Sequence, residues 1–341
     1  MKLQSTSGNI VYSDTEDHFK NGVLRLLNID QETFERWLET SDRYQGSILE
    51  KLARGFEHIR PSLISEKKWI IEPGPYQEEG YVWHQLDNTH YVIRSFDSSV
   101  AWLARADGNR LVREINPPIY EESYFEGDPT LSGGYGEYTE QSAWRLTKAA
   151  RQLDEIMCVT DLVEGKALDV GSGYGYFRHA LEKNKFLHEG IEISEYACKM
   201  TKYLYGYDTF LGTLDQYTEQ LESSYDLITM WDVIEHVADA VLLLQQAAHC
   251  LKPGGFLVLK TPNIDCPEAE ILGSHFYSLK REHLVYFTQL SLVKAAKAAG
   301  LSLYNHFTIS HFLRGFIGVD GVNQLKDDGR GADLVVYFRK D

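Results

Sequence analysis

The hydrophobic pattern of the chain changes along its length. Residues 18–28 and 31–60 carry apolar side chains at helical spacing, as in FERWLE and ILEKLARGFEHI. Short aromatic and β-branched runs follow, and VAWLARADGNRLVREI predicts a hairpin around an Ala-Asp-Gly-Asn turn. We therefore expect residues 1–118 to form a small α+β domain. Its boundary falls at NPPIY (116–120), because paired prolines resist both helices and inner strands.

Beyond this boundary, helical and strand patterns alternate. A helix over 140–158 precedes the buried strand KALDV, a glycine-rich turn, the helix YFRHALEKN and the strand HEGIEIS. The helix EYACKMTKYLY, the strands DTFLG and YDLITM and a helix over 233–251 come next. The strand FLVLKTP, a helix near 289–299 and the strands LSLYNHFTI and DLVVYFRK complete the order. Such alternation predicts that residues 119–341 form a doubly wound α/β domain with a mostly parallel sheet.

Composition narrows the classes of function. Hydrophobic residues make up 43% of the 341 positions, and the formal net charge is −16. A chain this acidic repels polyphosphate, so we expect no binding to nucleic acid or to an anionic membrane. Behind Lys2 there is no apolar core of a signal peptide, and no apolar run reaches the length of a membrane span. The four cysteines form no CxxC pair, which favours free thiols and a cytoplasmic location.

A glycine-rich turn carries the first candidate chemistry. ALDVGSGYGYF places Gly171 and Gly173 between a strand and a helix, where glycine lets the backbone turn sharply and approach a ligand. Glu192 ends the next strand, and a carboxylate at that place accepts hydrogen bonds from ribose hydroxyls. The dinucleotide fingerprint requires a third glycine where this chain has Tyr176. A nicotinamide dehydrogenase is therefore disfavoured.

These motifs and others resemble a known family. LDVGSGYG, GIEIS, YDLITMWDVIEHVAD, LKPGGFLVLKTPN and HLVYFT are similar, in this order, to the motif series of class I S-adenosylmethionine-dependent methyltransferases. The closest branch contains ubiquinone-pathway O-methyltransferases and sugar and natural-product methyltransferases. YFEGDPTLSGGYGEY (124–138) also resembles a segment upstream of the core in some bacterial members. The resemblance covers roughly residues 120–341 and implies a Rossmann-like fold with S-adenosylmethionine as cofactor.

The resemblance also implies a set of cofactor-binding residues. From the methionine end through the ribose and adenine to the sulfonium, they are Asp169, Gly171, Ser172, Gly173, Glu192, Ile193, Gly212, Thr213, Leu214, Trp231 and Asp232. Many relatives have an acid at the position where this chain has Thr213 or Leu214, so Asp215 is an alternative contact for the adenine amino group. Tyr135 and Tyr138 are expected either to close over the cofactor or to pack as a surface pair on the next helix.

The segment WDVIEHV carries a cluster of polar residues. On a helix, Asp232, Glu235 and His236 share one face, and His283 in REHLVYFT is expected to approach them. In one interpretation Asp232 caps the helix and His236 only makes hydrogen bonds that support neighbouring residues. In another, His236 or His283 is a general base. In the third, Glu235, His236 and His283, with Asp232 as a further candidate, hold a divalent cation. The resemblance favours the third, because ubiquinone-type and small-RNA 2′-O-methyltransferases use an acid-x-x-Glu-His set with a metal. Mixed carboxylate and imidazole ligands suit Mn²⁺, Fe²⁺ or Zn²⁺ better than Mg²⁺.

The sequence as a whole predicts a methyltransferase for a small-molecule substrate, with an oxygen of a sugar or secondary metabolite as the acceptor. N- or C-methylation and a non-catalytic S-adenosylmethionine-binding regulatory protein are the alternatives. Residues 1–118 are expected to select the substrate or to form a homodimer. Residues 260–263 are expected at the rim of the site. If the strand LSLYNHFTI runs parallel to the other strands, it ends at the same rim. His311, Phe312 and Arg314, which follow it, are then lid candidates, with a solvated hairpin loop as the alternative.

Overall fold

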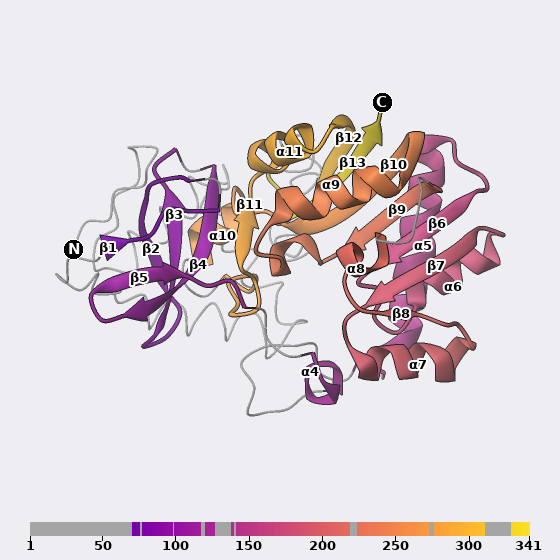
Figure 1. The fold of residues 1–341 in the computed structure, drawn as a ribbon, viewed down its shortest axis with the longest axis horizontal. Coiled ribbons are helices and arrows are strands. Elements are labelled where there is room, and N and C mark those ends of the chain that lie inside the picture. The colour runs from indigo at the N-terminus through magenta and orange to yellow at the C-terminus, as the bar shows by residue number, and fades with distance from the viewer. Residues whose placement is uncertain are drawn as a thin grey trace, which may run out of the picture.

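The fold contains two β-sheets that lie next to each other along the long axis of the molecule (Figure 1). The computed structural model describes residues 70–75, 77–97, 99–116, 120–126, 138–139, 141–218, 224–272, 276–310 and 329–341. The helices expected over 18–28 and 31–60, Tyr135, and the lid candidates His311, Phe312 and Arg314 lie outside these residues.

The aromatic and β-branched runs form the first sheet. Its strands are β1 (Ile70–Ile71), β2 (Gly80–Gln85), β3 (His90–Ser95), β4 (Val100–Asp107) and β5 (Arg110–Arg113), in the order β1-β5-β4-β3-β2. The predicted hairpin is confirmed, because β4 and β5 pair antiparallel with Asp107 opposite Arg110. A further strand, β11 (Val285–Phe287), pairs antiparallel with β4 (Figure 1). The later part of the chain therefore contributes to this sheet, while the division at residue 118 stays a prediction.

The second sheet is the one that the alternating pattern predicted. Its strands are β6 (Lys166–Val170), β7 (Leu187–Glu192), β8 (Phe210–Leu211), β9 (Tyr225–Trp231), β10 (Leu251–Pro262), β12 (Leu301–Ile309) and β13 (Asp333–Lys340). They are ordered β12-β13-β10-β9-β6-β7-β8, and β13 runs antiparallel to both of its neighbours. The pairs among the other strands are parallel. Consequently β12 runs in the same direction as β10 and ends at the same edge.

Helices cover both faces of the second sheet. The long ones are α5 (Ser142–Thr160), α6 (Tyr176–Lys183), α7 (Glu195–Tyr205), α9 (Ala240–Cys250) and α11 (Gln289–Ala298). Shorter ones are α4 (Glu122–Glu126), α8 (Leu214–Thr218), α10 (Pro267–Leu272) and the 3₁₀ helix η2 (Ile234–His236). Successive strand residues alternate between the faces: Leu227 packs in the core with α5 and α6, and Ile228 packs in the core with α9 and α11. The fold is therefore the predicted doubly wound α/β arrangement.

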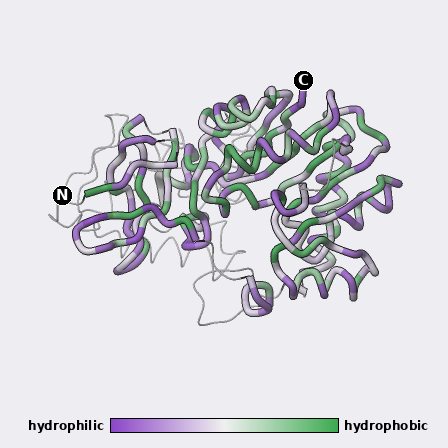
Figure 2. Tube along the Cα trace, in the orientation of Figure 1, coloured by the Kyte–Doolittle hydropathy of each residue, from purple (hydrophilic) through white to green (hydrophobic). Residues whose placement is uncertain are grey.

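Hydropathy along the chain follows this layering, with hydrophobic stretches along the strands that lie between the helices (Figure 2). Among the residues that the structure describes, no helix combines the length and the apolar character needed to cross a membrane.

One predicted helix begins later than the pattern indicated. The expected helix over 233–251 is wrong at its start, because η2 makes a single 3₁₀ turn and α9 begins after the N-cap Asp239. The Asp239 side chain accepts a hydrogen bond from the Leu242 N–H at 3.0 Å. Asp232 has a φ of 58°, in the left-handed region that few non-glycine residues adopt. The polar residues of WDVIEHV therefore do not share a helical face, and Asp232 is not the helix cap.

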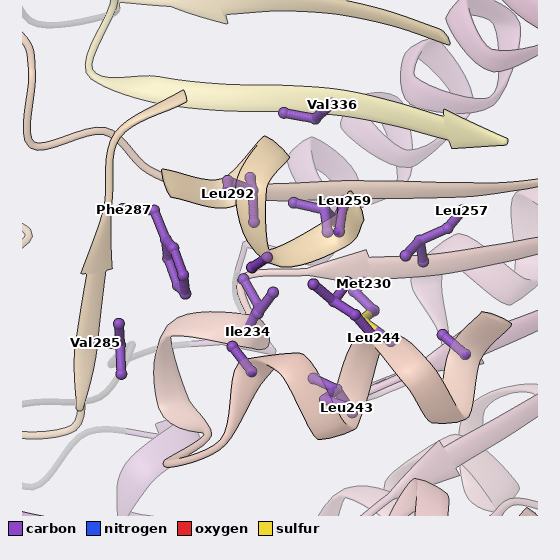
Figure 3. Close-up of a cluster of buried hydrophobic side chains, with 14 of the residues drawn as sticks. Met230, Ile234, Leu243, Leu244, Leu257, Leu259, Val285, Phe287, Leu292 and Val336 are labelled. Carbon is purple, nitrogen blue, oxygen red and sulfur yellow. The ribbon is translucent and has the colours of Figure 1, made fainter. Parts of the chain in front are cut away.

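One apolar core extends through both sheets. It contains Trp102 of β4, Phe287 of β11, Ile234 of η2 and Met230 of β9, all fully buried. In Figure 3, Phe287 on β11 points toward Ile234, which lies close to the side chains of α9. The loop that carries the polar cluster is thus packed from two directions, by α9 and by β11.

Candidate active site

A cavity of about 430 Å³ lies at the carboxyl edge of the second sheet. This edge is the usual place for ligands in doubly wound sheets, and the volume is in the range of small-molecule pockets. The predicted residues that line it are Tyr138, Gly171, Gly173, Glu192, Ile193, Gly212, Thr213, Leu214, Asp215, Trp231, Asp232 and His236. Most of the sequence-predicted cofactor set is therefore gathered around one cavity.

Two of the predicted cofactor residues that the structure describes are not part of the cavity lining. Asp169 is buried, and its Oδ1 accepts a hydrogen bond from the Thr229 hydroxyl at 2.7 Å. Burial raises the pKa of Asp169 to about 7, although the Thr229 hydrogen bond opposes this shift. Ser172 is buried with its hydroxyl oxygen unpaired among the described residues. We interpret Asp169 and Ser172 as structural residues that hold the glycine-rich turn in place.

The glycine-rich turn brings the backbone to the cavity wall. Gly171 and Gly173 have φ values of 70° and 51°, which glycine adopts without a steric penalty. A Cβ atom at Gly171 would lie 2.5 Å from Val233, and one at Gly173 would lie 3.0 Å from the Tyr138 hydroxyl. The Gly171 N–H donates to the carbonyl of Ile191 at 2.9 Å, which ties the turn to β7.

Glu192 is held in place by backbone donors. Its Oε2 accepts the Gly173 N–H and its Oε1 accepts the Ser194 N–H, both at 2.9 Å. Burial raises the pKa of Glu192, and these N–H groups lower it in part. Each carboxylate oxygen has a second lone pair, so the side chain retains acceptor capacity toward the cavity it lines.

The residues that follow β7 and β8 form another part of the cavity wall. Ile193 is 47% exposed although it follows a buried strand, and the exposed surface lines the cavity. Gly212 has a φ of 153°, and a Cβ atom there would lie 2.5 Å from Gln216 and 2.8 Å from Phe210. Asp215 lines the same region beside Thr213 and Leu214. The wall thus contains both candidates for the contact with the adenine amino group, the Thr213–Leu214 position and Asp215.

Three aromatic lining residues were missed in the sequence. Tyr120, Tyr124 and Phe125 line the cavity from α4 and the residues just before it, here called the roof segment (residues 120–126). The Phe125 carbonyl accepts the Tyr138 N–H at 3.1 Å, and the two rings lie 5.5 Å apart. The Glu126 carboxylate accepts a hydrogen bond from the Tyr174 hydroxyl at 2.6 Å. The dense aromatic spacing of YEESYF was the available signal.

Asp232 makes an ion pair instead of a helix cap. Its carboxylate contacts the ammonium of the buried Lys260, which also lies 3.4 Å from the Asp333 carboxylate. Burial disfavours the charged form of each group. Even so, Lys260 holds the pKa of Asp232 below its ordinary value, and Asp232 and Asp333 hold that of Lys260 above its own. Lys260 therefore links the ends of β9, β10 and β13 beside the cavity.

Glu235, His236 and His283 come together next to this ion pair. One potential ligand atom from each lies within 4.8 Å of the others, and the two imidazole rings are perpendicular with centroids 4.7 Å apart. Glu235 Oε2 accepts the Thr261 hydroxyl at 2.9 Å, whereas its buried Oε1 is unpaired among the described residues. Burial, with Asp232 nearby, raises the pKa of Glu235 to about 8. Asp232 is not a member of this group.

The hydrogen bonds of the two histidines fix their tautomers. His236 Nδ1 lies 2.8 Å from the Glu282 carbonyl, and His283 Nδ1 lies 2.8 Å from the Ser278 carbonyl. A carbonyl can only accept, so both Nδ1 atoms carry the proton and both Nε2 atoms have a free lone pair. Burial lowers both pKa values, which keeps the rings neutral. Metal-binding histidines have this arrangement, so the donor set fits a divalent cation.

The fold and the site together define the class of protein. A seven-stranded sheet with one antiparallel strand, a glycine-rich turn after β6 and an acid at the end of β7 form a Rossmann-like methyltransferase core. Residues 142–306 match a protein-family model described as a methyltransferase domain. This match, over just under half of the chain, identifies residues 142–306 as a methyltransferase domain of the class I S-adenosylmethionine-dependent kind, and S-adenosylmethionine is the cofactor of that family.

Individual proteins match this chain over part of its length. A ubiquinone biosynthesis O-methyltransferase from Thiobacillus denitrificans is 28% identical over 40% of this chain and 64% of its own length. A protein of the same name from Hydrogenovibrio crunogenus is 31% identical over 30% of this chain and 44% of its own length. The chain thus spans about half the length of these curated relatives. The solved structure of a SAM-dependent methyltransferase from Archaeoglobus fulgidus matches with a TM-score of 0.46 and 14% identity. This match covers 60% of this chain and 99% of the other.

Proposed function

We propose that this protein transfers the methyl group of S-adenosylmethionine to an oxygen atom of a small molecule, a sugar or a secondary metabolite. The observation that carries the proposal is a single cavity lined by the glycine-rich turn, by Glu192 and by His236. The wall that we propose to bind the cofactor is thus adjacent to the cluster that we propose to activate the acceptor. The similarity to proteins named ubiquinone biosynthesis O-methyltransferase supports oxygen as the acceptor atom.

In this proposal the cofactor spans the cavity. The backbone of Gly171 and Gly173 lies beside the methionine part, and Glu192 accepts hydrogen bonds from the ribose hydroxyls. The adenine is surrounded by Ile193, Gly212, Thr213 and Leu214. The sulfonium lies beside Trp231 and Asp232. The sulfonium already makes the methyl group electrophilic. The protein's main contribution is then to align the acceptor behind the methyl group. Orientation of this kind lowers the activation free energy by roughly 7–11 kcal/mol.

Glu235, His236 and His283 are proposed to hold a divalent cation. Three protein ligands leave coordination positions for an acceptor oxygen, and a bound cation lowers the pKa of a hydroxyl and fixes its direction. The mixed carboxylate and imidazole set favours Mn²⁺, Fe²⁺ or Zn²⁺. The competing proposal is that one histidine acts alone as a general base.

The direct test incubates the full-length chain with S-adenosylmethionine and a library of sugars and hydroxylated metabolites, and measures S-adenosylhomocysteine. We expect turnover that EDTA abolishes and that Mn²⁺ restores. His283→Ala should bind S-adenosylmethionine but fail to respond to Mn²⁺, whereas His249→Ala, at an exposed position on α9, should respond normally.

Two results would contradict parts of this proposal. Turnover that resists chelators and falls below about pH 6.5 would replace the cation with a histidine base. Cofactor binding without turnover on any acceptor would favour a regulatory protein. Substrate selection by residues 1–118, a homodimer and a cytoplasmic location stay predictions.

A further inference from the structure

Tyr120 connects the roof segment to the histidine cluster. Tyr124 and Phe125 of this segment line the cavity in which the cofactor is proposed to bind. At its other end, the Tyr120 hydroxyl lies 3.0 Å from His236 Nδ1, and the two rings meet edge to face with centroids 5.9 Å apart. Over these few residues, the chain therefore contacts both the cofactor cavity and one member of the candidate cation cluster.

The hydrogen-bond geometry gives this contact a direction. His236 Nδ1 has one proton, and the Glu282 carbonyl at 2.8 Å already requires that proton. The Tyr120 oxygen therefore accepts from the same N–H as the second partner of a three-centre bond. The two acceptors together orient the His236 ring and point its Nε2 lone pair away from them. Loss of the Tyr120 contact would leave one acceptor to hold the ring.

We propose that Tyr120 is a positioning residue that couples occupancy of the cofactor cavity to cation binding by Glu235, His236 and His283. The inference rests on the proposed function, which places the cofactor and the cation at these two sites. A ligand under Tyr124 and Phe125 restrains the roof segment, and Tyr120 passes this restraint to the His236 ring. By thermodynamic linkage, cofactor then tightens cation binding and the cation tightens cofactor binding by the same factor.

The experiment measures this coupling without turnover. The full-length chain is titrated with Co²⁺, followed by its visible absorption bands, with and without saturating S-adenosylhomocysteine. In the wild type we expect S-adenosylhomocysteine to lower the Kd of Co²⁺ about two- to tenfold, the value of one ordinary hydrogen bond. Tyr120→Phe should give the same Kd in both conditions while it still binds S-adenosylhomocysteine. Tyr203→Phe removes a tyrosine hydroxyl from α7, where Tyr203 is 83% exposed, and should retain the coupling.

The outcomes separate the inference from the function on which it rests. The inference would be overturned, and the proposed function left intact, by either of two results. The Kd of Co²⁺ in the wild type could be the same with and without S-adenosylhomocysteine, or Tyr120→Phe could show the same coupling as the wild type. Coupling that is lost equally in Tyr203→Phe would also overturn it, because the loss would then not depend on the contact between Tyr120 and His236. A wild type that binds no Co²⁺ or no S-adenosylhomocysteine would overturn the corresponding part of the proposed function, and the inference with it.

Discussion

Glu192 is fixed by the backbone N–H groups of Gly173 and Ser194. If it accepts hydrogen bonds from the ribose, Glu192→Ala should weaken S-adenosylmethionine binding roughly 10- to 100-fold. A hydrogen bond to a charged group contributes about 1.5–3 kcal/mol. Calorimetric titration measures the effect. Glu195→Ala is the matched control, because Glu195 is exposed and pairs with Lys199. Wild-type affinity in a folded Glu192→Ala protein would remove this residue from the site.

Asp169 makes a second residue-scale prediction, about pH. Its pKa is near 7 in the folded protein because of burial, and near 3.9 in an unfolded chain. The folded state therefore retains a proton that the unfolded state loses, and the free energy of unfolding should fall as pH rises from about 4 to about 7. The full change is on the order of 4 kcal/mol. Urea unfolding at several pH values should show a flatter profile for Asp169→Asn than for the wild type.

The control for this effect is Asp226→Asn. Burial raises the pKa of Asp226, but the Lys166 N–H and the Lys252 ammonium lower it further, so its net shift is downward. Its contribution to stability is present above its unfolded pKa and is lost only as pH falls through the folded value. Asp226→Asn should therefore reduce stability at neutral pH and leave the slope between pH 4 and 7 unchanged. An unchanged slope in Asp169→Asn would contradict the assignment.

At the residue scale, the sequence predicted those site residues that lie on consecutive elements of the chain. The glycine-rich turn follows β6 and Glu192 ends β7, the next strand, so strand order alone places them at one edge of the sheet. Lys260 and Tyr120 could not be assigned in this way. Lys260 of β10 contacts Asp232, which follows β9, and Tyr120 contacts His236, which lies 116 positions further along the chain. Both contacts therefore depend on tertiary packing.

At the scale of elements, the predicted start of α9 failed for a physical reason. Apolar residues continue at helical spacing from 233 to 251, and either Asp232 or Asp239 is a good N-cap by residue type. Packing decides between them, because β11 and the His283 loop hold η2 in place: the Leu284 N–H donates to the Glu235 carbonyl at 2.7 Å. Local periodicity contains no information about this contact.

The cap at Asp239 can be tested by itself. Asp239→Ala removes the acceptor of the Leu242 N–H and should lower the free energy of unfolding by about 1 kcal/mol, within a range of roughly 0.5–2. Asp239→Asn should restore most of this loss, since asparagine is an equally good N-cap. Urea denaturation measures both. If Asp239→Ala is as stable as the wild type, the helix does not depend on this cap.

At the scale of the molecule, the two sheets share a core. The paired prolines at 117–118 predicted a boundary in the sequence, and no local pattern indicated that β11 returns to β4. Leu284, Val285 and Phe287 are at most 1% exposed, in the core that also contains Trp102 of β4. Each large apolar side chain that loses its cover costs about 1.5–3 kcal/mol. The three together therefore approach the whole stability of a typical domain, about 5–15 kcal/mol.

A chain that begins at residue 119 should consequently fail to unfold cooperatively in urea, although every proposed cofactor residue is retained. The point variant Trp102→Ala tests the same contact in the full-length protein, and truncation of a buried aromatic residue should cost about 3–5 kcal/mol. Phe96→Ala is the control, because Phe96 follows β3 of the same sheet but is 66% exposed. It should change stability by less than about 0.5 kcal/mol. A cooperative fragment with wild-type affinity for S-adenosylmethionine would show instead that the methyltransferase domain folds without β4, and that β11 only docks against it.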